Sequence, residues 1–327
     1  MRVAVIGAGI AGLNAARQLE AAGMEAVLFE KARGASGRLS TRRSDFGAFD
    51  HGAQYFTARD DEFRNQVEAW LAEGVVERWN GRIVRLSGGG ESTEGSPIER
   101  YVGSPGMSAI ARDLRGDLNI SLGVRIESVK RVGNRWTLTA HDGSEFPDFD
   151  SLVIAVPAPQ AVPFLSSVPE FDREVRLVNM APCHAVMVRF QKSYDPEFDA
   201  AFVDSKSLSW VARNSSKPGR GPEDCWVLHS TVEWSASNLD ADPNDVTKSL
   251  LLAFQEAVGS TLPPTDFSAM HRWLLSRSLH PLRSGPLWDA DQSLGVCGDW
   301  TIGDRVEDGY MSGSRLVRRI LDDKCAS

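Results

Sequence analysis

The chain has few cysteines and no pattern among them. Its four cysteines are widely spaced, with no Cys-X-X-Cys pair and no histidine at metal-ligand spacing: Cys183, Cys225, Cys297 and Cys325. This spacing argues against a recognisable zinc site and against a disulfide framework. We therefore expect a reduced protein that binds no metal.

Long apolar runs and an excess of basic charge are also missing. The N-terminal stretch MRVAVIGAGIAGL is apolar, but only Arg2 flanks it as a basic residue, and no run of about 18 apolar residues follows. The formal net charge of −8 argues against non-specific nucleic-acid binding, which needs a basic surface to displace counterions. We expect a cytoplasmic protein that binds neither nucleic acid nor a membrane.

The first thirty residues have the pattern of a βαβ unit. An apolar run over Arg2–Ile6 ends at Gly7, and a second one covers Glu25–Glu30. Between them Ala11, Ala15 and Leu19 recur at helical spacing. Unalternating apolar runs are typical of strands buried on both faces of a parallel sheet.

The rest of the chain predicts an α/β fold with a second sheet. Strands are expected over Ile120–Val132 and Arg135–Ala140 (a hairpin at Gly133-Asn134), Ser151–Val156, His184–Phe190, Cys225–Val232 and Gly295–Gly298. Helices are expected over Asp61–Ala72, Val246–Val258 and Gly313–Leu321, and loops over Ala32–Gln54 and Gly88–Pro97. We predict a Rossmann-like domain, with a parallel sheet, helices and a β-meander, from residues 1–75, 100–160 and 270–327. Residues 76–99 and 161–269 are predicted to form a smaller antiparallel-sheet substrate domain.

The strongest signal is the motif Gly7-Ala8-Gly9-Ile10-Ala11-Gly12, which Glu30 follows 18 residues later. Gly7 permits the tight turn out of the strand, Gly9 lets the backbone approach a pyrophosphate, and Gly12 permits close packing of helix on strand. Free N–H groups at the helix N-terminus attract phosphates. Glu30 can accept hydrogen bonds from a ribose, so the motif predicts a dinucleotide site.

Two further segments favour flavin adenine dinucleotide (FAD) over NAD. Residues 31–38 (KARGASGR) form a glycine-rich basic loop suited to a second approach to the pyrophosphate. Near the C-terminus a strand ends at Asp299, and such a residue can bind the ribityl chain of a flavin, which NAD lacks. The turn and helix through residues 309–313 could direct N–H groups at the flavin C2 carbonyl.

These motifs resemble the flavin-containing amine oxidase superfamily, and within it the renalase branch. The resemblance covers nearly the whole chain and rests on VAVIGAGIAGLNAARQL, Glu30, ASGRLSTRR, FDHGAQYFTAR, HRW at residues 271–273, and GVCGDW through DGYMSGSRL. The first and last motifs are shared across the superfamily, whereas FDHGAQYFTAR and the compact length indicate the renalase branch. Ser36 stands where much of the superfamily has glycine, but Arg38 is kept.

The resemblance implies a set of cofactor contacts. Arg38 would contact the dinucleotide, Gln54 and Tyr55 would lie near the isoalloxazine, and Val124 would make a backbone contact on the adenine side. The whole expected set is Gly7, Gly9, Ala11, Gly12, Glu30, Lys31, Arg38, Gln54, Tyr55, Val124, Asp299, Val306 and Glu307. No cysteine has the Ser-Gly-Gly-Cys setting of covalent attachment, so we expect non-covalent FAD.

The reaction follows partly from what the chain lacks and partly from the resemblance. No second Gly-X-Gly-X-X-Gly motif with its own βαβ unit is present, so the substrate is expected to reduce the flavin directly. By the resemblance, that substrate is a 2- or 6-dihydro isomer of NAD(P)H, whose hydride passes to flavin N5, leaving NAD(P)⁺. Dioxygen then becomes hydrogen peroxide. Loss of hydride gives an aromatic cation directly, so no catalytic acid or base is predicted.

Expected substrate contacts are Thr57, Arg59, His184 and Ile302. Arg59 either binds a substrate phosphate bidentately or is a solvated surface residue. His184 lies in an apolar strand and either faces the substrate or belongs to the core. Three aromatic residues either stack near the flavin or fill the core: Trp288, Trp300 and Tyr310.

Two alternative functions stay open. One is an FAD-dependent amine oxidase acting on small amines, which would have a pair of aromatic side chains around the amine. The other is a non-catalytic dinucleotide-binding module.

Overall fold

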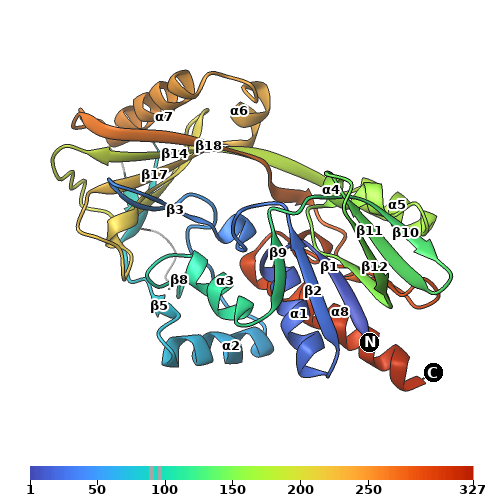
Figure 1. Ribbon diagram of the computed structural model, residues 1–327. Coiled ribbons are helices and arrows are strands. Elements are labelled where there is room, and N and C mark those ends of the chain that lie inside the picture. Colours follow the sequence, from blue (N-terminus) through green and yellow to red (C-terminus); the bar gives the residue numbers. More distant parts are fainter. Residues whose placement is uncertain (88–91, 95–97, 327) are drawn as a thin grey trace.

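A six-stranded sheet gathers both ends of the chain in the computed structural model, which describes residues 1–87, 92–94 and 98–326 (Figure 1). The strand order is β19-β20-β13-β1-β2-β9, and all neighbours are parallel except β19 and β20. The strands are β1 (Arg2–Ile6), β2 (Glu25–Glu30), β9 (Asn119–Leu122), β13 (Ser151–Ile154), β19 (Leu287–Asp289) and β20 (Leu294–Val296). The predicted parallel sheet is confirmed.

Both faces of this sheet are buried, which explains the unbroken apolar runs. On β1, Val3 and Val5 join the core formed with helices α1 (Ile10–Ala21) and α8 (Val306–Ala326). Ala4 and Ile6 join the core on the opposite face. Since neither face meets water, neither needs polar residues.

A three-stranded antiparallel meander covers that opposite face, with strands β10 (Ile126–Val132), β11 (Arg135–Ala140) and β12 (Glu145–Phe149). The predicted hairpin between β10 and β11 is confirmed. The single strand predicted over 120–132 is wrong, because β9 pairs with β2 and β10 pairs with β11. Gly123 separates them with a φ of +74°, a left-handed conformation that ends a strand and favours glycine.

The second large sheet has seven strands, in the order β18-β14-β17-β16-β15-β6-β7. Only β15 and β6 pair in parallel; the other neighbours are antiparallel. The strands are β6 (Ile83–Leu86), β7 (Ser92–Glu94), β14 (Asn179–Phe190), β15 (Ala200–Val203), β16 (Leu208–Arg213), β17 (Cys225–Ser230) and β18 (Thr265–His280). The predicted α/β class with a parallel and an antiparallel sheet is confirmed.

The two faces of the second sheet meet different partners. Along β14, Val186 and Val188 pack toward α7 (Pro243–Val258), whereas Met187 packs against Phe49 of β4 (Gly47–Asp50). Helices α6 (Val232–Ser237) and α7 therefore cover one face, as Figure 1 shows. The other face turns toward β4 and the chain that follows it.

Shorter elements complete the fold. They are strands β3 (Thr41–Ser44), β5 (Val76–Arg78) and β8 (Tyr101–Gly103), α-helices α2 (Asp61–Ala72), α3 (Ser108–Arg115), α4 (Ala158–Ala161) and α5 (Pro169–Arg176), and 3-10 turns η1 (Gly37–Leu39), η2 (Val162–Phe164), η3 (Asn214–Ser216) and η4 (Asp299–Thr301).

Several predicted boundaries need correction. The loop expected over residues 32–54 contains the β3–β4 hairpin, and the helix expected over 313–321 is the middle of the longer α8. The strand expected to end at Val232 stops at Ser230, because Thr231 caps α6. Of the loop expected over 88–97, residues 88–91 and 95–97 lie outside the described residues, and 92–94 form β7.

Two segments cross the predicted domain limits. Phe164, Leu165 and Val168 pack in the core under the parallel sheet, although residues 161–269 were expected in the substrate domain. The long strand β18 runs through residue 270 and lies wholly in the antiparallel sheet.

Replacing Phe254 with alanine should destabilise the second sheet, because Phe254 is fully buried against β17 and a cavity would remain. We expect Phe254→Ala to lower the free energy of unfolding by about 3–5 kcal/mol. Leu252 lies on the same helix but is 56% exposed, so Leu252→Ala should change it by less than about 0.5 kcal/mol. Urea unfolding followed by circular dichroism measures both, and equal midpoints would contradict this packing.

Candidate active site

The turn between β1 and α1 has the geometry predicted for the glycine motif. Gly7 has a φ of +102°, and a side chain on Gly12 would overlap the Gly7 carbonyl oxygen. A Cβ on Gly9 would meet nothing within 4 Å, so this backbone faces open space at the N-terminus of α1. Ala11 lies in the first turn with its carbonyl against Gly313 of α8. A pyrophosphate can therefore approach the backbone N–H groups here, because no side chain blocks them.

Glu30 holds the glycine turn and the following loop together. Its two carboxylate oxygens accept hydrogen bonds from the N–H groups of Ala8 (2.9 Å) and Ala32 (2.8 Å). The Val124 N–H donates to the Glu30 carbonyl at 3.0 Å, which places Val124 at this corner as well. Lys31 is exposed, and its ammonium donates to Gln160 at 2.9 Å. The residues expected on the adenine side are thus neighbours.

The basic loop and the C-terminal Gly-Asp meet in an ion pair. The Arg38 guanidinium donates to both carboxylate oxygens of Asp299, at 2.8 and 2.6 Å, and to the Ser276 carbonyl at 3.0 Å. Burial opposes the charge on Arg38, but Asp299 outweighs it and raises the pKa of Arg38. In the same loop, a Cβ on Gly37 would lie 3.3 Å from Gly9 Cα. The two glycine-rich segments therefore converge.

The segment after β4 contains Gln54, Tyr55 and Thr57. The buried Gln54 amide donates to the carbonyls of Asp50 and Gly52, the latter at 3.2 Å. Aromatic rings surround Tyr55, with ring centroids 5.7 Å from Trp210 and 6.1 Å from Trp79. Thr57 is half-buried on the same extended segment.

The start of α8 is hydrogen-bonded to the segment that follows Thr57. The Glu307 carboxylate accepts hydrogen bonds from the backbone N–H groups of Arg59 and Asp60, each at 2.6 Å. Glu307 is 6% exposed, and Val306 beside it is half-buried. Arg59 is thus brought together with Glu307 and its neighbour Val306, although Arg59 and Glu307 are 248 residues apart in sequence.

Sequence reasoning missed a buried charge cluster behind Gln54. Asp50 has no solvent exposure and pairs with Arg220 and, at 3.6 Å, with Lys217. Lys217 donates to Gln54 Oε1 and Asn214 Oδ1, each at 3.1 Å. Burial lowers the pKa of Lys217 to about 8, whereas the two cations keep the pKa of Asp50 below its usual value against the opposing effect of burial. Lys217 lies in the polar stretch NSSKPGR, which carries no apolar periodicity to mark it.

A second cluster, also missed, consists of aromatic and histidine rings. The His51 ring stacks on Trp273 with centroids 5.2 Å apart and meets His271 edge-on at 4.8 Å. The His51 carbonyl accepts the Trp273 Nε1–H at 2.9 Å and lies 3.2 Å from His229 Nε2. Burial lowers the pKa of both His51 and His229 to about 4, so both are neutral at pH 7.

The structure does not bring His184 to the other expected residues. His184 has no solvent exposure and lies on β14 with the same orientation as Val186 and Val188, facing α6 and its Trp234. Because side chains alternate along a strand, this face is opposite the one that meets Phe49. The expected substrate contact is corrected to a core position.

Two of the three candidate stacking residues also belong to the core. Trp300 is fully buried and donates to the Val156 carbonyl at 3.0 Å. Tyr310 packs against Phe63, and its hydroxyl donates to Gln66 at 3.0 Å. Trp288 is half-buried, and its indole N–H has no hydrogen-bond partner within the described part of the chain.

A cavity of about 420 Å³ contains two of the expected substrate residues, Arg59 and Ile302. Three more arginines line it, Arg277, Arg283 and Arg305, together with the acids Asp304 and Asp308. Arginines therefore outnumber acids in the lining by four to two.

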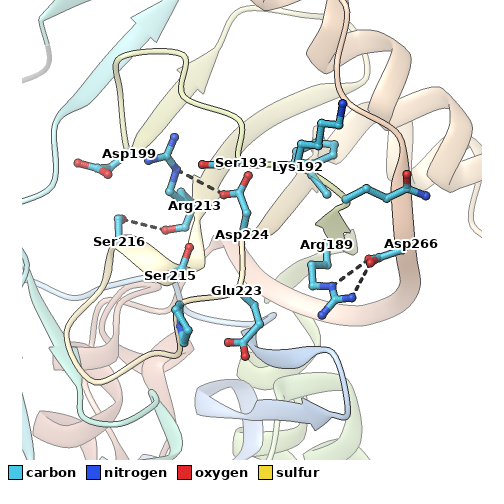
Figure 2. Close-up of a pocket in the computed structure, with 13 residues that line it drawn as sticks. Arg189, Lys192, Ser193, Asp199, Arg213, Ser215, Ser216, Glu223, Asp224 and Asp266 are labelled. Carbon is cyan, nitrogen blue, oxygen red and sulfur yellow. Dashed lines mark hydrogen bonds and ion pairs between the residues drawn. The ribbon is translucent and has the colours of Figure 1, made fainter.

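A larger cavity of about 660 Å³ contains none of the expected residues (Figure 2). Two ion pairs lie in its lining: Arg189 binds Asp266 at 2.5 Å, and Arg213 lies 3.7 Å from Asp224. Four acids and three basic side chains line this cavity, so the smaller cavity is the better candidate for a dinucleotide substrate.

Comparison with known proteins gives two family matches. Residues 5–73 match the NAD(P)-binding Rossmann-like domain, and residues 81–321 match the flavin containing amine oxidoreductase family. Among solved structures, the chain resembles a proposed protoporphyrinogen oxidase from Exiguobacterium sp. 255-15, with a TM-score of 0.77, 14% identity and 98% of each chain covered. It also resembles putrescine oxidase bound to putrescine, with a TM-score of 0.75 and 13% identity over 98% of this chain and 99% of that one. At these identities the structural likeness concerns the fold.

Neither a membrane-spanning helix nor a metal site occurs among the described residues. None of the helices described is both long and apolar enough to span a bilayer. The described residues also contain no group of three or more histidine, cysteine, aspartate or glutamate side chains placed to hold a metal ion.

The protein should lose stability as the pH falls from about 6.5 toward 4. His51 and His229 have pKa values of about 4 in the folded protein, whereas histidine in an unfolded chain titrates near 6.5. In that window the unfolded chain binds protons that the folded chain does not. Each histidine should therefore lower the free energy of unfolding by about 1.4 kcal/mol per pH unit of fall.

Urea unfolding at several pH values measures this slope. His229→Gln should reduce the slope by about 1.4 kcal/mol per pH unit, the contribution of one buried neutral histidine, and His141→Gln, at an exposed position, should leave it unchanged. Identical slopes for wild type and His229→Gln would show that His229 is not buried in a neutral form.

Proposed function

This chain belongs to the flavin-containing amine oxidoreductases, FAD-binding enzymes, and from this premise we propose that it is a renalase-like oxidase of 2- or 6-dihydro isomers of NAD(P)H. Its products are NAD(P)⁺ and hydrogen peroxide. In this proposal FAD is bound without a covalent link by the part of the chain that contains the parallel sheet. The substrate binds between the cofactor and the face of the antiparallel sheet that α6 and α7 do not cover. We further propose a cytoplasmic location.

The residues at the carboxyl ends of β1, β2 and β20 fit FAD. Gly9 presents open backbone at the N-terminus of α1, and Gly37 lies directly beside it. Arg38 and Asp299 extend this line toward α8. Phosphates would bind at Gly9 and Gly37, a ribose at Glu30, and the ribityl chain at Asp299.

The chemistry that FAD supplies when bound is uptake of a hydride from the substrate and transfer of the two electrons to dioxygen. The hydride carries one of the two protons of hydrogen peroxide, and solvent supplies the other. No side chain has to remove a proton from the substrate, because the dihydropyridine becomes aromatic when the hydride leaves.

The chain's own contribution is orientation and charge. Lys217 and the Asp50 carbonyl fix the Gln54 amide from both ends. Asp50, Lys217 and Arg220 together leave one excess positive charge in a fully buried cluster. Such a charge stabilises negative charge that develops next to Gln54.

The observation that carries the choice of substrate is the sign of the charge around Arg59 and Ile302. Four arginines and two acids line their cavity. A small amine is a cation near neutral pH and is repelled there, whereas the diphosphate of a dinucleotide is an anion and is attracted.

An amine oxidase remains the second candidate because the ring of Tyr55, next to Gln54 in the chain, lies close to that of Trp210. Their ring centroids are 5.7 Å apart, at 49°. A pair of aromatic faces can hold an amine in its neutral or cationic form.

Asp299→Asn should weaken FAD binding. The substitution keeps the shape of the side chain but removes the charge that pairs with Arg38, and charged hydrogen bonds contribute about 1.5–3 kcal/mol. We expect at least a roughly tenfold rise in the Kd for FAD. Flavin absorbance per protein after gel filtration measures retention. Asp172→Asn, which breaks the exposed ion pair with Arg176, is the control, and equal retention in both variants would contradict the assigned role.

The reaction is tested by mixing the anaerobic, FAD-loaded protein with partially isomerised NADH and, separately, with small amines. We expect the isomers to bleach the flavin absorbance rapidly, and admission of air should then restore it with release of hydrogen peroxide. Bleaching by amines alone would replace the proposed function with amine oxidation. Bleaching by neither would indicate a binding module without turnover.

A further inference from the structure

We propose that the arginine-lined cavity beside Ile302 is a phosphate subsite that holds the diphosphate of the dinucleotide substrate. Its ligands are Arg59, Arg283 and Arg305. This assignment rests on the proposed function and deepens it, because it separates the part of the protein that anchors the substrate from the part that takes the hydride.

The acids in the cavity are already engaged. Asp304 pairs with Arg277. Asp308 accepts hydrogen bonds from the backbone N–H groups of Asp304 and Arg305, both at 3.0 Å. Asp308 also interacts electrostatically with Arg305, so the lining of four arginines and two acids keeps a formal excess of two positive charges.

Three guanidinium groups remain for a ligand. Across residues 1–87, 92–94 and 98–326, no hydrogen bond or ion pair engages the guanidinium groups of Arg59, Arg283 and Arg305. Guanidinium groups bind phosphate oxygens with two parallel hydrogen bonds, and three of them suit a diphosphate better than a single carboxylate.

Arg283 lies in a loop that has a strained backbone and is hydrogen-bonded to its neighbours on both sides. Its φ is +64°, in the left-handed region that arginine rarely adopts. The loop is bound on both sides to η4, through Leu282 N–H to the Trp300 carbonyl (2.9 Å) and Gly285 N–H to the Thr301 carbonyl (3.0 Å). Strain of this kind persists where surrounding structure fixes a functional residue. Because η4 begins at Asp299, the loop places Arg283 at a set position relative to the cofactor residues.

A subsite of this kind should act on affinity and leave the chemical step unchanged. The phosphates do not change during hydride transfer, so their contacts are equally strong before and during the reaction. Loss of an arginine should therefore raise the Kd of the substrate without lowering the limiting rate of flavin reduction.

The test uses the FAD-loaded protein under anaerobic conditions and rapid mixing. The variants are Arg283→Asn, since asparagine tolerates a positive φ, and Arg305→Gln. Arg173→Gln, at an exposed position on α5, is the matched control. Each protein is mixed with partially isomerised NADH and with equally isomerised reduced nicotinamide riboside, which carries no phosphate.

We expect each cavity variant to raise the apparent Kd for the dinucleotide about tenfold at an unchanged limiting rate. The riboside should behave identically with all four proteins. An unchanged Kd for the dinucleotide in both cavity variants would overturn the proposal. An equal loss for the riboside would also overturn it, because the arginines would then act through something other than phosphate.

Failure of the proposed function can be told apart from failure of the subsite. If neither compound reduces the wild-type flavin, calorimetric titration with ADP and with inorganic pyrophosphate tests whether the phosphate subsite exists. ADP binding that is lost in Arg283→Asn supports the subsite. Absence of ADP binding to wild type overturns it, and binding of pyrophosphate without ADP would identify a site for free phosphate and overturn the dinucleotide assignment.

Discussion

The arrangement of the site depends on one fully buried carboxylate. Asp50 has no contact with water, so its charge must be compensated by groups from elsewhere in the chain. Arg220 and Lys217 supply the opposite charge, and Thr41 Oγ1 and the Met107 N–H, at 2.7 and 3.0 Å, complete its hydrogen bonds. The β3–β4 hairpin, the start of α3 and the loop after β16 must therefore meet. Gln54, four residues beyond Asp50, takes its orientation from this meeting point.

The residues expected to bind the cofactor are held together by contacts between the two ends of the chain. Arg38 and Asp299 are 261 residues apart in sequence but share two hydrogen bonds. Helices α1 and α8 pack closely enough that a side chain on Gly313 would overlap Ala11. Because β20 joins the parallel sheet beside β13, Asp299 is delivered to the same sheet edge as Gly9 and Glu30. Ligands bind at this edge in open α/β sheets.

Local charge, more than net charge, distinguishes the substrate side. The chain has a net charge of −8, yet arginines outnumber acids around Ile302. Two of the four arginines come from the loop and strand before β19, one from the segment before α2 and one from the turn before α8. Only folding brings them together. Of the two acids, Asp304 pairs with Arg277, and Asp308 accepts hydrogen bonds from backbone N–H groups. An anionic substrate can therefore find an attractive site on an acidic protein.

The sequence by itself determined the cofactor class, because the glycine motif, Glu30 and the Gly298-Asp299 strand end are local patterns whose geometry follows from backbone sterics. It also located helices α1, α2 and α7, part of α8, and several strands, such as β1, β2 and β11, from their periodicity. It could not show that residues 120–132 serve two sheets, that His184 faces α6, or that Lys217 lies behind Gln54. These three features depend on which strands pair, which face turns inward and which distant charges meet. Such long-range choices are decided only when the whole chain packs, because no local pattern encodes them.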